Sequence, residues 1–81
     1  MDWTHENDKL QRDFTFTDFR QAFAFMTEVA FAAETANHHP EWRNVYNRVQ
    51  ISLTTHDAGN TVTEKDRKLA AAIDRIFARY A

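Results

Sequence analysis

The N-terminal part of the chain shows the alternation of apolar and polar residues that is typical of a strand. Phe14 and Phe16 alternate with polar residues within 10–16, and this period of two indicates a strand that is buried on one side. Residues 1–8 are polar apart from Trp3. We therefore expect a strand at 10–16, preceded by a short strand or an extended arm.

A second alternating region lies in the middle of the chain. Val49, Ile51 and Leu53 are each separated by one polar residue, so one face of this strand is apolar and the other polar. The region 42–55 is long enough for two strands. We predict an antiparallel pair joined by a tight turn at Asn47-Arg48.

Between these regions the apolar period changes to that of a helix, from Asp18 to Asn37. Thr17-Asp18 supplies an N-cap, whereas Asn37 is suited to the left-handed residue that ends a helix, and Pro40 prevents continuation. The positions expected to face the core are Phe19, Ala22, Phe23, Met26, Val29, Ala30 and Ala33. Phe31 lies off this stripe, which suggests a pocket wall or a subunit contact.

The C-terminal part of the chain is predicted to form a second helix after a loop at 56–62. Thr63-Glu-Lys-Asp66 fits a capping box in which aspartate replaces the usual glutamate. The apolar stripe of this helix consists of Leu69, Ile73, Ile76, Phe77 and Tyr80.

The order of these elements is strand, strand, helix, strand, strand, helix, with short links that favour antiparallel pairing. We predict an α+β fold in which two helices pack on one face of a four-stranded antiparallel sheet, with residues 1–81 forming a single domain. One sheet face then lacks a helical cover. Together with the small size of the chain and the position of Phe31, this leads us to expect a homodimer or homotetramer.

Composition excludes several classes of function. The chain has 43% hydrophobic and 27% charged residues, a net charge of −2 and no cysteine. The lack of a basic surplus gives no support to nucleic-acid or anionic-membrane binding, and thiol chemistry is impossible. No segment has the roughly 20 apolar residues of a membrane helix, and the polar N-terminus does not resemble a signal peptide, so we expect a cytoplasmic protein.

Three of the four histidines surround the predicted central strand pair. His38 and His39 follow the first helix, and His56 follows the strand that ends in Leu53-Thr54-Thr55. Glu34 shares a helix side with His38, and Asp66 begins the last helix. Histidine is suited to acid–base catalysis because its pKa of about 6.5 lies near neutral pH. These residues predict a proton-transfer site at one edge of the sheet.

Other interpretations of these residues remain open at this point. Glu34, His38, His39 and His56 are acceptable zinc or iron ligands, but adjacent histidines rarely reach one ion and no His-x-x-x-His pair occurs. The histidine pair is also consistent with a simple helix end, where positive charge is favourable. Asp66 is adequately explained as a capping residue.

A longer spaced motif contains these residues: Glu34-x-x-x-His38-His39-Pro40, then Tyr46, His56 and Asp66 after intervals of five, nine and nine residues. The flanking segments at 16–19, 22–26, 37–47 and 52–57 read Phe-Thr-Asp-Phe, Ala-Phe-Ala-Phe-Met, Asn-His-His-Pro-Glu-Trp-Arg-Asn-Val-Tyr-Asn and Ser-Leu-Thr-Thr-His-Asp. This pattern resembles the signature of the pterin-4a-carbinolamine dehydratases from about Phe14 to the C-terminus.

The resemblance implies the same fold, assembled into dimers or tetramers, and a reaction without metal or organic cofactor. The family removes water from a 4a-hydroxytetrahydropterin to give quinonoid dihydropterin, and so recycles the cofactor of aromatic amino acid hydroxylases. It implies an acid–base pair of His38 and His56, with His39 binding and polarising the substrate. The substrate-binding residues would be Glu34, Trp42, Thr54, Thr55 and Asp66, and Asp66 would support His56 or the loop before it. Two alternatives remain. One is a non-enzymatic binding protein or coactivator with this fold, and the other is a metal-dependent hydrolase.

Overall fold

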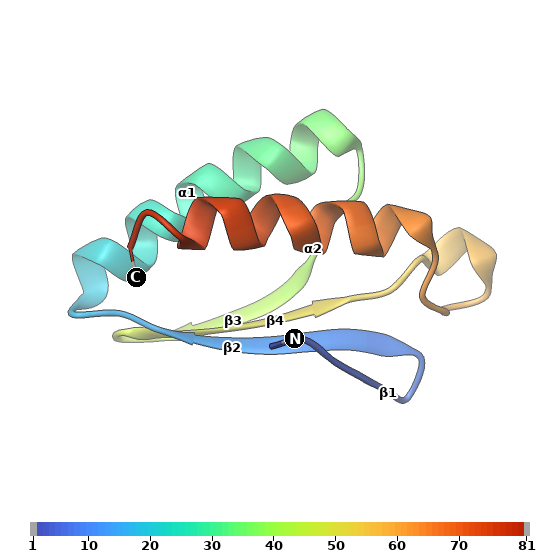
Figure 1. Cartoon of the computed structure of the whole chain (residues 1–81), viewed down its shortest axis with the longest axis horizontal. Coiled ribbons are helices and arrows are strands. Elements are labelled where there is room, and N and C mark those ends of the chain that lie inside the picture. The colour runs from blue at the N-terminus through green and yellow to red at the C-terminus, as the bar shows by residue number, and fades with distance from the viewer. Residues whose placement is uncertain (1, 81) are drawn as a thin grey trace.

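The four strands form one antiparallel sheet with both helices on the same face, as Figure 1 shows. The computed structural model describes residues 2–80. Its elements are β1 (Thr4–Glu6), β2 (Lys9–Thr15), α1 (Phe19–Ala36), β3 (Glu41–Val45), β4 (Arg48–Leu53), a 3₁₀ turn at His56–Ala58 and α2 (Glu64–Phe77). The spatial strand order is β1-β2-β4-β3. The predicted fold class and element order are confirmed.

The tight turn between β3 and β4 lies one residue earlier than the sequence suggested. Val45 pairs with Arg48, so Tyr46 and Asn47 form the turn. Tyr46 adopts a φ of 50°, and the Asn44 side chain donates hydrogen bonds to the carbonyls of Tyr46 and Arg48. The predicted position of the turn was wrong because Asn44, a residue of β3, makes these side-chain hydrogen bonds and so closes the turn before Arg48.

The core face of α1 differs in phase from the predicted stripe. Phe19 and Phe23 are 46% and 56% exposed, and Ala30 is also exposed, whereas Phe25 is fully buried. Phe25 packs at 4.9 Å, measured between ring centroids, from both Phe14 and Phe16. The Phe-Ala-Phe run at 23–25 allowed two helix rotations, and contact with the β2 aromatics selected the one that buries Phe25. The actual core face of α1 is Ala22, Phe25, Val29 and Ala33.

The starts of both helices and the end of α1 carry the predicted caps. Asp18 Oδ1 accepts a hydrogen bond from the Gln21 N–H at 2.9 Å, and Asn37 ends α1 with a φ of 51°. A capping box starts α2 at Thr63. Helix α2 buries Leu69 and Ile73 as predicted, but it ends at Phe77, so Tyr80 packs against Phe16 from beyond the helix.

The helix-free face of the sheet is polar. Paired residues on this face include Gln11 with Ser52, Asp13 with Gln50, and Arg43 with Gln50. The exposed side chain of Val45, which pairs with Arg48, is an apolar exception on this polar face. The large exposed apolar side chains are Phe19, Phe23, Phe31, Val45 and Tyr46. Within residues 2–80, no helix is both long and apolar enough to span a membrane.

Candidate active site

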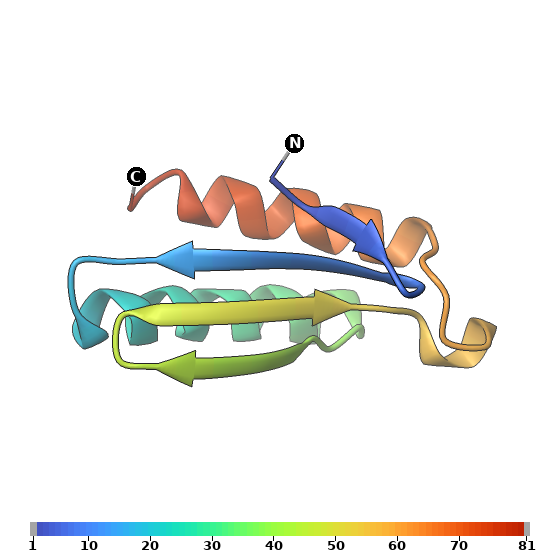
Figure 2. The same cartoon turned by 90° about the horizontal axis from the view of Figure 1, so that it is seen from below.

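The open end of the β3–β4 hairpin brings together chain segments that are far apart in sequence. His38 and His39 lie just before β3, and Thr54 to His56 lie just after β4, so antiparallel pairing places both segments at the same end (Figure 2). The N-terminus of α2 reaches this end as well. A cleft of about 230 Å³ opens here, lined by Asn37, His38, His39, Thr54, Thr55, His56, Asp57 and Lys65.

Backbone hydrogen bonds explain why the two histidine segments meet. Asn37 turns the chain out of α1, and the His38 N–H donates to the Ala33 carbonyl at 3.1 Å, so His38 emerges at the helix end. After β4, Thr55 forms an isolated bridge with Thr61, which folds the loop back on itself. Gly59 closes that loop with a φ of 86°, a conformation that favours glycine. His56 is thereby held at the rim of the cleft.

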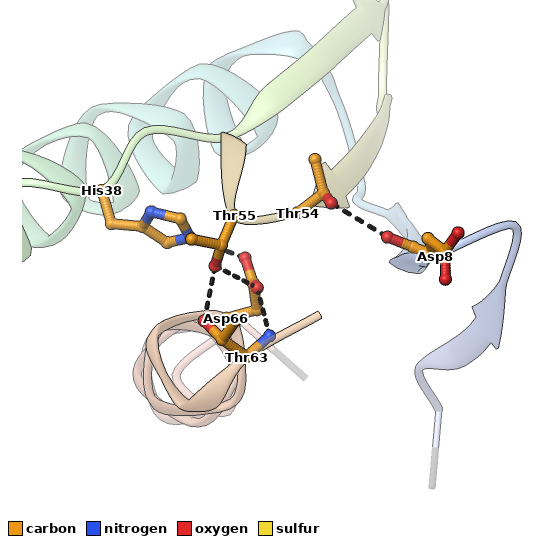
Figure 3. A network of polar contacts seen from close by, with 6 residues as sticks. All are labelled: Asp8, His38, Thr54, Thr55, Thr63 and Asp66. Atoms are coloured by element: carbon orange, nitrogen blue, oxygen red, sulfur yellow. Dashed lines mark hydrogen bonds and ion pairs between the residues drawn. The ribbon is translucent and has the colours of Figure 1, made fainter. Parts of the chain in front are cut away.

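Figure 3 shows a hydrogen-bond network that joins two cleft-lining residues, His38 and Thr55, to Asp66 and Thr63 of α2 and its cap. His38 Nε2 lies 2.6 Å from Asp66 Oδ1. Asp66 Oδ2 accepts hydrogen bonds from Thr55 Oγ1 at 2.7 Å and from the Thr63 N–H at 2.8 Å. Asp66 is completely buried, and the side chain of His38 is only 10% exposed. The capping residue of α2 thus also anchors a histidine of the cleft.

The protonation state of Asp66 determines which nitrogen of His38 carries the proton in the neutral ring. Burial by itself raises the pKa of Asp66, but hydrogen bonds from Thr55, His38 and the Thr63 N–H together outweigh it and lower that pKa below its usual value of 3.8. An ionised carboxylate can only accept hydrogen bonds, so His38 Nε2 carries the proton that it donates to Asp66. The neutral ring therefore has its unprotonated lone pair on Nδ1, which is the arrangement of a general base.

The other two histidines are held at the surface of the cleft. His56 Nδ1 lies 2.7 Å from Asn60 Oδ1, an acceptor, so Nδ1 donates and Nε2 is the nitrogen available to a ligand. His39 Nε2 lies 2.8 Å from Glu34 Oε1, with side chains 60% and 79% exposed. An exposed pair of this kind contributes little stability. His56 and His39 therefore remain accessible to both solvent and ligand.

The structure brings five of the eight predicted site residues to the lining of the cleft: His38, His39, Thr54, Thr55 and His56. Thr54 Oγ1 is also bonded to the Asp8 carbonyl at 2.9 Å. Asp66 lies beneath the cleft and contacts His38 and Thr55, not His56. The Glu34 side chain does not line the cleft and is hydrogen-bonded to His39.

Trp42 is placed elsewhere than the sequence suggested. It is half-buried on β3, opposite Ile51, and packs against the hydrophobic core instead of lining the cleft. Sequence reasoning missed three lining residues: Asn37, Asp57 and Lys65. Each is the immediate neighbour of a motif residue, and this adjacency was the only signal in the sequence that could have identified them.

The arrangement of possible ligands does not favour a metal centre. Among the described residues, no three His, Asp or Glu side chains converge as a metal site requires. His38 directs Nε2 to a buried carboxylate, and His39 directs Nε2 to Glu34 on the outside. The geometry is instead that of three separately oriented imidazoles around one small cleft.

Comparison with known proteins adds independent information. Residues 1–76 match the family model described as pterin 4 alpha carbinolamine dehydratase. A protein of Solibacter usitatus, provisionally named pterin-4-alpha-carbinolamine dehydratase, is 58% identical over 76 residues, which cover 94% of this chain and 79% of that protein. A Rhodopseudomonas palustris protein with the same provisional name is 58% identical over 73 residues, covering 90% of this chain and 71% of the relative.

Two solved structures share the fold. A crystal structure described as a transcriptional coactivator/pterin dehydratase from Brucella melitensis superposes with a TM-score of 0.87 and 44% identity, covering 93% of this chain and 81% of that one. A pterin dehydratase-like protein identified as a RuBisCO assembly factor in the alpha-carboxysome gives a TM-score of 0.74 with 25% identity, covering 91% and 84%. The fold is thus found in proteins whose descriptions name more than one role.

Proposed function

Because the chain belongs to the pterin-4a-carbinolamine dehydratase family, we propose that it dehydrates 4a-hydroxytetrahydropterins by histidine acid–base catalysis in the cleft. The observation that best supports this mechanism is the orientation of His38 by buried Asp66, beneath a cleft that His56 also lines. In the cell, the reaction would return the spent cofactor of aromatic amino acid hydroxylases to the recycling pathway.

The reaction requires two proton transfers. One proton is delivered to the 4a-hydroxyl, whose C–O bond breaks so that it leaves as water. A second proton is removed from a ring nitrogen, and the ring electrons form the new double bonds of the quinonoid product. The substrate ring itself supplies the electrons, so the protein needs only a base, an acid and a surface that positions the ring.

His38 is suited to the role of base. Asp66 fixes the ring orientation and the tautomer, which leaves Nδ1 as the unprotonated nitrogen of a histidine that lines the cleft. When Nδ1 takes up a proton, the imidazolium that forms faces the ionised carboxylate of Asp66, which stabilises it. Thr55 and Thr63 in turn hold Asp66 in place.

His56 is suited to the role of acid. It lies at the exposed rim, where it can regain a proton from solvent after each turnover. Its Nδ1 is held by Asn60, so Nε2 is the nitrogen that delivers a proton to the departing hydroxyl. His39, whose outer nitrogen is bonded to Glu34, binds the substrate, and Thr54 and Thr55 complete the wall of the cleft.

A stopped-flow dehydration assay tests the proposed activity. The 4a-hydroxytetrahydropterin is generated immediately before mixing, and quinonoid product is followed by absorbance. We expect catalytic amounts of protein to accelerate product formation well above the buffer rate. A protein that binds the pterin but gives no acceleration would instead be a binding protein or coactivator with this fold.

We predict that activity does not depend on a bound metal. After exhaustive dialysis against a strong chelator, the rate of dehydration should equal that of untreated protein, because both proton transfers are assigned to imidazoles. Elemental analysis of the same samples verifies that metal has been removed. Loss of activity that one equivalent of a divalent metal restores would establish a metal-dependent reaction.

We also predict a dimer or tetramer in solution, with α1 in the interface. Phe31 is 71% exposed, and Phe19 and Phe23 form an exposed aromatic pair on the same helix. Light scattering at micromolar concentration should give two or four times the 9.5 kDa chain mass. Phe31→Glu should dissociate the assembly, whereas Gln11→Glu, on the polar sheet face, should not. A monomeric wild type would disprove the assembly, and an intact Phe31→Glu oligomer would place the interface elsewhere.

A further inference from the structure

The hydroxyl group of Thr63 belongs to the hydrogen-bond network around Asp66 but does not line the cleft. Thr63 Oγ1 lies 2.5 Å from Thr55 Oγ1, as the dashed line between them in Figure 3 shows. Thr63 is the residue just before α2, and the described residues that line the cleft do not include it. Any effect of this hydroxyl group on a ligand in the cleft must therefore act through its neighbours.

The direction of the bond between the two threonines follows from the charge of Asp66. Thr55 has a single hydroxyl proton, and Asp66 Oδ2, 2.7 Å away, belongs to an ionised carboxylate that can only accept. The Thr55 proton is therefore committed to Asp66, and Thr55 Oγ1 must accept the proton of Thr63. The result is a chain of donors that runs one way, from Thr63 through Thr55 to Asp66. The other carboxylate oxygen receives the Nε2–H of His38.

The start of α2 requires the oxygen of Thr63 but not its hydroxyl proton. In a capping box, the hydroxyl oxygen of the N-cap residue accepts a backbone N–H, and α2 begins with such a box. Accepting a hydrogen bond uses a lone pair, so the proton remains to be donated. The donation to Thr55 is therefore a second interaction of the same side chain, beyond what the helix needs.

Loss of the Thr63 proton would leave a buried acceptor without its donor. Thr55 is only 6% exposed, so solvent does not readily replace that donor. Linked hydrogen bonds also polarise one another, so donation by Thr63 strengthens the bond from Thr55 to Asp66. Without it, Asp66 would be held less firmly, and so would the ring of His38 that Asp66 orients.

We propose that Thr63 is a positioning residue whose hydroxyl proton, donated to Thr55, keeps Asp66 in the place where it orients the candidate base. This inference rests on the proposed function, in which His38 is that base. It assigns Thr63 a role in turnover and not in substrate binding. Removal of the hydroxyl group should therefore lower kcat and leave KM unchanged.

Three variants of Thr63 separate the hydroxyl proton from the helix cap. Thr63→Ser keeps both, Thr63→Gly keeps a good N-cap residue without the hydroxyl group, and Thr63→Val loses both. Dehydration kinetics should give the wild-type kcat for Thr63→Ser. For Thr63→Gly and Thr63→Val, kcat should be roughly two- to tenfold lower, the factor expected for one lost hydrogen bond. Asp18→Ala, which removes the N-cap side chain of α1, serves as the matched control and should leave kcat unchanged.

A dependence of kcat on capping alone would overturn the inference. In that case Thr63→Gly would have the kcat of wild type, and only Thr63→Val would be slower. An equal loss of kcat in Thr63→Ser and Thr63→Val would overturn it as well. The double variant Thr63→Val/Asp66→Asn should have the kcat of Asp66→Asn alone, because Thr63 acts through Asp66. A further decrease in the double variant would show that Thr63 acts by another route.

Proton exchange at His38 tests the inference independently of turnover. NMR measures how fast the Nε2–H exchanges with solvent, which requires opening of its bond to Asp66. Exchange should be roughly two- to tenfold faster in Thr63→Gly and Thr63→Val than in wild type and Thr63→Ser. If exchange follows this pattern but wild type does not dehydrate the substrate, the proposed function is wrong and the role of Thr63 in the network stands. If wild type is active but neither exchange nor kcat changes, the proposed function stands and the inference about Thr63 is wrong.

Discussion

Replacement of His38 by alanine should lower kcat by about 10²–10⁴, the range expected when a positioned acid–base group is lost. His38 is nearly buried, and its ring is oriented by Asp66, so no solvent molecule can take over Nδ1 in the same geometry. His56→Ala should lower kcat within the same range, because the proposed mechanism assigns the second proton transfer to His56. Steady-state kinetics with saturating 4a-hydroxytetrahydropterin provide the measurement.

The third histidine is the internal control for this prediction. His39 is exposed and bonded to Glu34, outside the buried network, so His39→Ala should mainly raise KM, as expected for the loss of uniform binding. The double variant His38→Ala/His56→Ala should cost less than the product of the single effects if both groups act in one proton-transfer step. The assignment fails if His39→Ala abolishes kcat while His38→Ala or His56→Ala leaves it intact.

Replacement of Asp66 by asparagine should lower kcat almost as much as loss of His38 itself, although the two side chains have nearly the same shape. The position of Oδ2 receives two donors, Thr55 Oγ1 and the Thr63 N–H, so the amide oxygen of asparagine should occupy it. The amide NH₂ then points at His38 Nε2, which must accept. The ring proton moves to Nδ1, and the base is lost to the wrong tautomer. We expect a decrease in kcat of about 10²–10⁴.

The stability of Asp66 variants separates this tautomer effect from unfolding. Asp66→Ala removes a buried acceptor from three donors and should lower the free energy of unfolding by about 3–5 kcal/mol, whereas Asp66→Asn should lose about 1–3 kcal/mol. Chemical denaturation measures both. Glu64→Gln, an exposed carboxylate in the same helical turn, should change stability by at most about 0.5 kcal/mol. A folded Asp66→Asn variant with wild-type kcat would refute the role of Asp66 in fixing the tautomer.

The pH dependence of stability follows from the same residue. The folded state lowers the pKa of Asp66 below its usual value of 3.8, so the unfolded chain binds this proton more readily. The stabilisation is therefore complete above the usual value and is lost as pH falls toward the folded-state pKa. Below that usual value, wild type should lose stability more steeply than Asp66→Asn.

Local signals in the sequence were sufficient for the element order, the fold class, the starts of both helices and the end of α1. Alternation at 49–53 and the helical period at 19–36 depend only on which side of an element is buried. The caps at Asp18, Asn37 and Thr63 depend on the side chains and backbone of adjacent residues. These properties extend over one or two turns of chain, so residue types and spacing determine them.

Where two local arrangements were equally good, only packing between elements decided. Either Phe23 or Phe25 could face the core from α1, and the aromatic residues of β2 selected Phe25. The turn of the β3–β4 hairpin was shifted by one residue through hydrogen bonds from Asn44. Trp42 was assigned to the cleft by resemblance, but its position opposite Ile51 on β3 directs it to the core.

The candidate site shows the same division most clearly. The sequence alone identified His38, His56 and Asp66 as chemically important, and it explained Asp66 as a helix cap. Only the tertiary structure shows that Asp66 pairs with His38. Their atoms Oδ1 and Nε2 lie 2.6 Å apart, although the two residues are 28 positions apart in the sequence. A hydrogen bond across that separation depends on how α2 lies against the end of the hairpin. Residue spacing along the chain carries no information about this geometry, and it is this geometry that makes Nδ1 of His38 the candidate base.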